Sequence, residues 1–81
     1  MITQAAILQD GVIYTGKRHA DVIHDMIVIH EVGYDFKSIQ GFVTDKGEFL
    51  DRFDAKKHFI DAGQISVNPP LRDLLYSEDL Y

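Results

Sequence analysis

Hydrophobic and polar positions along this chain form two successive patterns of the same kind. In the first, the strand-like runs 3–9 and 12–14 flank Asp10-Gly11, a pair that favours a tight hairpin turn. Apolar residues then recur at helical spacing, which predicts a helix from about residue 17 to residue 31. The stripe of this helix is formed by Val22, Met26 and Ile29. Thr15 is its candidate N-cap, and Gly33 is its candidate C-cap.

The second pattern follows a predicted loop over residues 34–41. Short strands are expected at 42–44 and 48–50, on either side of the turn Asp45-Lys46-Gly47. Asp51 has the side chain of an N-cap residue, and the helix that it begins is expected over 52–62. Gly63 then ends this helix.

Together the two patterns predict an α+β fold of the form ββα-ββα. A four-stranded antiparallel sheet with two helices on one face would bury both helical stripes. Residues 1–33 form the first half and 41–63 the second half of a single domain over 1–81. The resemblance of the halves is consistent with an internal duplication or with the usual construction of α+β domains.

The C-terminal segment, residues 68–81, carries too many leucines and tyrosines for a disordered tail. We expect it to pack on its own domain or on a neighbouring subunit. The side chains expected to pack are Leu75, Tyr76, Leu80 and Tyr81. Ser77, Glu78 and Asp79 resemble the start of a helical turn.

Composition narrows the class of protein. The chain is 46% hydrophobic and 26% charged and has no cysteine, as in an ordinary globular domain without disulfides. No apolar run is long enough to span a membrane, and the N-terminus lacks the basic region of a signal peptide. We therefore expect a cytoplasmic protein without membrane partners. Because 81 residues enclose only a small core, we also expect a homo-oligomer.

The net charge of −5 argues against binding a long nucleic acid, which calls for a basic surface. Even so, the positive run Gly16-Lys17-Arg18-His19 stands where the first helix begins. A helix N-terminus already carries partial positive charge, and a bound anion would resolve this conflict. Arg18 and Lys17 would hold the anion and His19 would donate a further bond. The alternative is a solvated first turn whose long side chains lie over the sheet.

The second helix begins with a similar feature. Arg52 lies in its first turn, between Asp51 and Phe53. If the two halves pack with pseudo-symmetry, Arg52 would reach the same anion; otherwise it forms a surface ion pair. Tyr14 and Phe53 offer stacking surfaces for a base, unless they serve the core. The predicted ligand-binding residues are therefore Tyr14, Lys17, Arg18, His19, Asp51, Arg52 and Phe53.

Other kinds of chemistry find little support in the sequence. Gly11-x4-Gly16-Lys17 lacks the Ser or Thr that completes a phosphate-binding loop, because Arg18 takes that position. The histidines do not have the spacing of zinc enzymes, and no serine has the setting of a nucleophile. We therefore expect no metal site, no cofactor and no catalytic residue.

Five segments of the chain resemble a set of small phage and prophage proteins. In those proteins the segments follow the pattern GKRHAD…GF(V/L)T…DRxEA…AGQI…SEDL, and this chain has them in the same order. Together they cover most of the chain. Two residues depart from the pattern: Asp54 replaces the usual Glu, and Phe59 is bulkier than usual. The segments are Gly16-Lys17-Arg18-His19-Ala20-Asp21, Gly41-Phe42-Val43-Thr44, Asp51-Arg52 with Ala55, Ala62-Gly63-Gln64-Ile65, and Ser77-Glu78-Asp79-Leu80.

By analogy, this resemblance implies the role of a phage anti-defence protein. Such a protein acts in the host cytoplasm and sequesters a small anionic, nucleotide-like signal without turnover, in the class of cyclic ADP-ribose or cyclic oligonucleotides. Two alternatives remain open. One is a small enzyme that cleaves such a ligand with His19 or His58 as general acid or base. The other is an acidic interaction module that inhibits a host protein.

Overall fold

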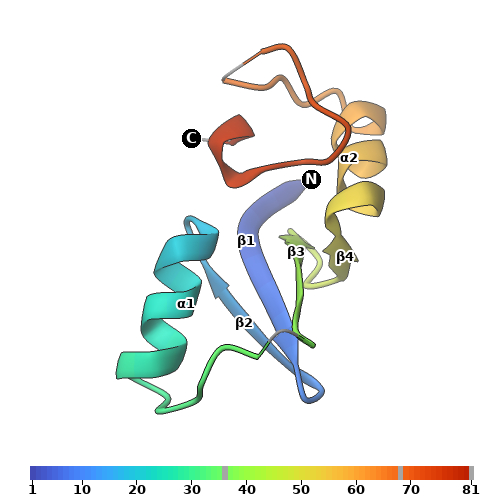
Figure 1. Ribbon diagram of the computed structural model, residues 1–81. Helices are drawn as coiled ribbons and strands as arrows, with labels where there is room; N and C mark the ends of the chain where they lie inside the picture. The colour runs from blue at the N-terminus through green and yellow to red at the C-terminus, as the bar shows by residue number, and fades with distance from the viewer. Residues whose placement is uncertain (36, 68, 81) are drawn as a thin grey trace.

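A computed structural model describes residues 1–35, 37–67 and 69–80 of the chain. Four antiparallel strands form one sheet in the order β2-β1-β3-β4, accompanied by two helices (Figure 1). This confirms the predicted α+β fold. The elements are β1 (Ile2–Gln9), β2 (Val12–Gly16), α1 (His19–Val28), β3 (Ile39–Thr44), β4 (Phe49–Asp51), α2 (Arg52–Asp61) and a short 3₁₀ helix, η1 (Ser77–Asp79).

Both helices pack on the same face of the sheet. The core joins side chains of β1 and β3 to α1, α2 and the C-terminal segment. Alternate strand residues point to this face, as the pleat requires. The fully buried members of the core are Ala5, Ile7, Val22, Met26, Phe42, Ala55 and Leu75, and Phe59 is 1% exposed.

The strand register places the starts of both helices about half-way along the length of the central strands. Thr15, Ala6, Gly41 and Asp51 lie in one row across the four strands. β2 ends one residue after this row and β4 ends at it, so α1 and α2 both leave the sheet here. In Figure 1 the helices run in opposite directions from this level. Both positively polarised N-termini therefore lie at this level of the sheet.

Three predicted turns and caps are confirmed. Asp10 and Gly11 both have positive φ, 52° and 77°, as a type I′ hairpin turn requires. The Asp51 carboxylate accepts a 2.8 Å hydrogen bond from the Asp54 N–H and so caps α2. Gly63 follows α2 with a φ of 74°.

The predicted loop over 34–41 is wrong for its last three residues. β3 begins at Ile39 because the long strand β1 offers it partners, with Leu8 opposite Ile39 and Ile7 opposite Gln40. Sequence periodicity within 34–41 does not show this, since the partner strand is more than thirty residues away.

The predicted ends of α1 are also wrong. Thr15 pairs with Ala6 in the sheet, so the N-cap is Arg18 instead. The helix ends at Val28 with Ile29 as its C-cap, and the Ile29 side chain is 66% exposed and does not join the core stripe. Gly33 lies beyond the helix end.

The C-terminal segment lies across the helix-bearing side of the molecule (Figure 1). Leu75 is fully buried, and its N–H donates to the Arg52 carbonyl oxygen at 3.2 Å. Tyr76 and Leu80 are half-buried, whereas the expectation for Tyr81 lies outside the described residues. No helix in the described part of the chain is both long and apolar enough to cross a membrane.

Candidate ligand-binding site

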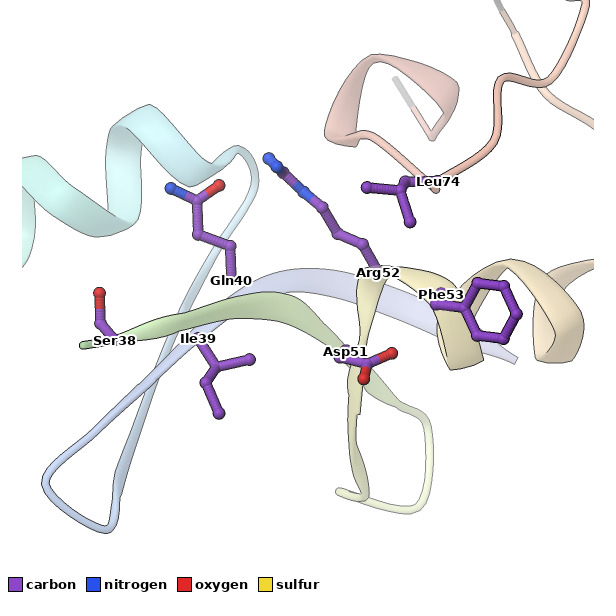
Figure 2. Close-up of a pocket in the computed structure, with 7 residues that line it drawn as sticks. All are labelled: Ser38, Ile39, Gln40, Asp51, Arg52, Phe53 and Leu74. Atoms are coloured by element: carbon purple, nitrogen blue, oxygen red, sulfur yellow. The ribbon is translucent and has the colours of Figure 1, made fainter. Parts of the chain in front are cut away.

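A surface pocket of about 500 Å³ opens at one edge of the sheet, where β4 gives way to α2 (Figure 2). β4 pairs with residues 41–43 of β3 and then stops at Asp51, so residues 38–40 extend beyond it. The chain that turns away into α2 forms the other wall. The lining residues are Ser38, Ile39, Gln40, Asp51, Arg52, Phe53 and Leu74.

The pocket takes side chains from both faces of the sheet. Gln40 lies opposite the core residue Ile7 and therefore faces the helices, whereas its neighbour Ile39 faces the other side. Figure 2 shows the Arg52 side chain extending toward the same side as Gln40. The Asp51 carboxylate points away from it, so the two opposite charges do not neutralise each other directly.

Arg52 is the cation of the pocket. Its side chain is half-buried, and no carboxylate among the described residues lies within ion-pair distance of it. The Nε atom of Arg52 is buried and has no hydrogen-bond partner among the residues that the structure describes. The guanidinium carbon lies 4.9 Å from the centre of the Tyr76 ring. A guanidinium offers five N–H donors, so Arg52 keeps donor capacity for an anion.

The other polar groups of the pocket are partly engaged. The Gln40 amide donates to the Tyr34 hydroxyl at 2.7 Å, and the Ser38 hydroxyl donates to the Asp35 carbonyl oxygen. Phe53 is 53% exposed, and the Lys57 ammonium lies 4.6 Å from its ring centre. This ring is therefore an accessible aromatic surface beside a second positive charge.

His19 is buried near this site. Its ring Nε2 donates to the Gly41 carbonyl oxygen at 2.7 Å, and the ring packs edge-on against Phe42 at 5.0 Å between centroids. Its Nδ1 is buried without a hydrogen-bond partner among the described residues. Burial lowers the pKa of His19 below 6.5, and nearby Arg52 lowers it further. The bond to Gly41 and the charge of Glu78 oppose this shift.

The structure thus brings some of the predicted site residues together and leaves others apart. Asp51, Arg52 and Phe53 line the pocket, and His19 is electrostatically coupled to Arg52. Tyr14 packs edge-on against His30 instead, at 5.2 Å. The remaining two, Lys17 and Arg18, lie at the start of α1, do not line the pocket and each interact with other groups. The ligand-binding roles of Tyr14, Lys17 and Arg18 stay predictions.

Four lining residues were missed by sequence reasoning: Ser38, Ile39, Gln40 and Leu74. Three of them belong to the stretch assigned to a loop. Leu74 belongs to the C-terminal segment, whose position over α2 follows from tertiary contacts alone.

The fold and this pocket define a small two-layer α+β protein with an arginine-lined site at the sheet edge. A family model described as "Phage T4 y16D protein" matches residues 1–81, and the chain therefore belongs to this family of phage proteins. The expected phage origin is confirmed. No curated protein and no solved structure matches the chain.

Proposed function

We propose that this phage protein binds a small phosphorylated, nucleotide-like ligand at the pocket between β3, β4 and α2. The observation that carries the proposal is Arg52, a half-buried guanidinium in a pocket wall without a carboxylate partner among the described residues. Removing such a cation from water is unfavourable unless something else compensates it. A phosphate oxygen pair matches the fork of an arginine well.

The two sequence neighbours of Arg52 can contact the base and the ribose of a nucleotide. Phe53 offers an exposed ring on which a base can stack. Asp51 offers carboxylate oxygens on the other side of the pocket, where they can accept hydrogen bonds from ribose hydroxyls. The three consecutive residues thus supply contacts for phosphate, base and sugar.

The electrostatic setting favours a small anion over a long one. The N-terminus of α2, where Arg52 itself lies, adds partial positive charge beside this side chain. The start of α1 is also near, because Arg52 lowers the pKa of His19 there. The whole chain carries a net charge of −5, so a long polyanion would meet repulsion away from the pocket. We therefore infer a local anion site on an acidic protein.

The lining residues favour binding over cleavage. Histidine is not among them, the Ser38 hydroxyl already donates to a backbone carbonyl, and Asp51 caps α2. His19 is buried, with its N–H bound to Gly41. We propose that the protein sequesters a host signal of the cyclic ADP-ribose or cyclic oligonucleotide class in the host cytoplasm, without turnover.

Calorimetric titration with cyclic ADP-ribose isomers and with cyclic di- and trinucleotides tests binding. At least one of these should bind with a Kd in the micromolar range or below. Arg52→Gln should weaken that binding by about 100-fold, because it removes the charged fork. Lys46→Gln, which removes an exposed charge at the β3–β4 turn, should leave it unchanged. Absence of binding by every one of these ligands would overturn the proposal.

Chromatography of the ligand separates sequestration from catalysis. After incubation with the protein and heat denaturation, an intact ligand should be recovered. A chemically altered ligand would show the enzyme instead. If none of the ligands binds and Arg52→Gln has no effect during infection, the protein-interaction alternative gains support.

A further inference from the structure

A second arginine shares the aromatic ring on which Arg52 lies. The guanidinium carbon of Arg72 is 4.1 Å from the centre of the Tyr76 ring, and that of Arg52 is 4.9 Å from the same point. The two cations therefore cannot lie farther apart than these two distances added together. Residues twenty positions apart in the sequence are brought to one place by the C-terminal segment.

These two charges are poorly compensated by the protein. Among the described residues, Arg72 has one carboxylate within ion-pair distance, with 3.4 Å between its Nη2 and the Glu78 Oε2, and both side chains are about half exposed. Such a long, exposed ion pair contributes little. Arg52 has no ion pair among the described residues, and like charges this close repel each other. The Tyr76 ring attracts both guanidinium groups and so holds them together.

We infer that Arg72, which lies beside the pocket and not in its lining, is a second anion-binding residue, and that the ligand carries two anionic groups, as a pyrophosphate or a pair of phosphates does. This inference rests on the proposed function, because it assumes that Arg52 binds the first anionic group. Two guanidinium groups beside the same ring suit a ligand with two neighbouring phosphates better than a ligand with a single phosphate. Without ligand, Arg72 forms a weak ion pair with Glu78, and a bound phosphate would replace this carboxylate.

The carboxylate of Asp79 holds the backbone that carries this ring. The Tyr76 N–H donates to the Asp79 Oδ2 at 3.0 Å, and the Ser66 hydroxyl donates to Oδ1 of the same carboxylate at 2.8 Å. Asp79 is fully buried. Asp79, which belongs to the Ser77-Glu78-Asp79-Leu80 segment of the phage pattern, thus holds the backbone of the ring that both arginines contact.

Two inorganic probes test the inference: phosphate and pyrophosphate, titrated while NMR follows the side-chain Nε–H signals of the three arginines. Pyrophosphate should bind about 10-fold more tightly than phosphate and should shift the signals of both Arg52 and Arg72. Arg72→Gln should abolish this preference and leave phosphate affinity unchanged. Glu78→Gln should tighten pyrophosphate binding, since it removes the competing carboxylate, and Lys46→Gln is the control for loss of an exposed charge.

The outcomes separate the two proposals. If pyrophosphate binds no better than phosphate, or if Arg72→Gln keeps the preference, the inference about Arg72 is overturned while the role of Arg52 stands. If neither probe shifts the Arg52 signal and none of the nucleotide ligands binds, the proposed function itself fails. Tyr76→Phe should behave like the wild type and Tyr76→Leu should reduce the preference; equal behaviour of these variants would exclude the ring as a platform.

Discussion

The imidazole of His19 donates its Nε2–H to the carbonyl oxygen of Gly41 at 2.7 Å and thereby fastens the start of α1 to the middle of β3. His19 is the first residue of α1, and Arg52 is the first residue of α2. Both lie beside the row of the sheet that contains Gly41 and Asp51, where the chain leaves the outer strands and enters the helices. This bond therefore fixes the position of one helix start relative to the other.

Replacement of His19 by alanine should destabilise the fold. The change removes a buried hydrogen bond and an aromatic contact with Phe42, and it leaves a cavity. We expect the free energy of unfolding in urea to fall by about 2–3 kcal/mol. His24→Ala is the matched control on the same helix, because the His24 side chain is 69% exposed. A His19→Ala variant as stable as His24→Ala would contradict the packing described.

The same histidine makes stability depend on pH. Burial and nearby Arg52 lower the pKa of His19 in the folded state below 6.5, so the unfolded chain binds this proton more readily. The stabilising contribution is complete above pH 6.5 and is lost as the pH falls through the folded-state pKa. His19→Gln keeps an N–H donor but does not titrate, so the difference in unfolding free energy between wild type and variant should shrink as the pH falls. A pH-independent difference would contradict this prediction.

Gly41 is required where the end of β4 pairs with β3. A Cβ at this position would lie against the Leu50 carbonyl oxygen, 2.8 Å from the Phe49 ring and 3.0 Å from the Asp51 Cα. Two of these neighbours are backbone atoms and cannot move without breaking the pairing of β4. Gly41→Ala should therefore lower the unfolding free energy by about 3 kcal/mol.

The control for this change is Gly33→Ala. A Cβ there has no neighbour within 4 Å, so the change should stay within about 0.5 kcal/mol of the wild type. Comparison of the two urea midpoints decides the matter. Equal midpoints would mean that the close approach of β4 to Gly41 is absent in solution.

Local signals in the sequence were enough for much of the fold. Asp10-Gly11, Asp51 and Gly63 each act through their own backbone or their nearest neighbours, so their roles can be predicted without tertiary information. The start of β3 depends on its partner strand β1, and Thr15 is taken into the sheet by its pairing with Ala6. Sequence periodicity therefore predicted the elements but misplaced the start of β3 and both ends of α1.

The candidate site divides in the same way. Arg52, with its neighbours Asp51 and Phe53, could be predicted because a cation at a helix start is electrostatically unusual. His19 was predicted to bind the anion for the same reason, yet its ring is buried against Phe42. The proximity of Arg72 to Arg52 could not be predicted, because only the path of the C-terminal segment brings it to the ring that Arg52 also contacts.

The buried carboxylate of Asp79 provides a test of that path. Asp79→Ala leaves the Ser66 hydroxyl and the Tyr76 N–H without this acceptor, and we expect a loss of about 2 kcal/mol in unfolding free energy. Hydrogen exchange should also become faster at the Leu75 amide, which reports whether the segment stays bound to Arg52. Asp73→Ala, an exposed change in the same segment, should alter neither quantity. If the Leu75 amide of Asp79→Ala stays as protected as in the wild type, this carboxylate does not hold the C-terminal segment in place.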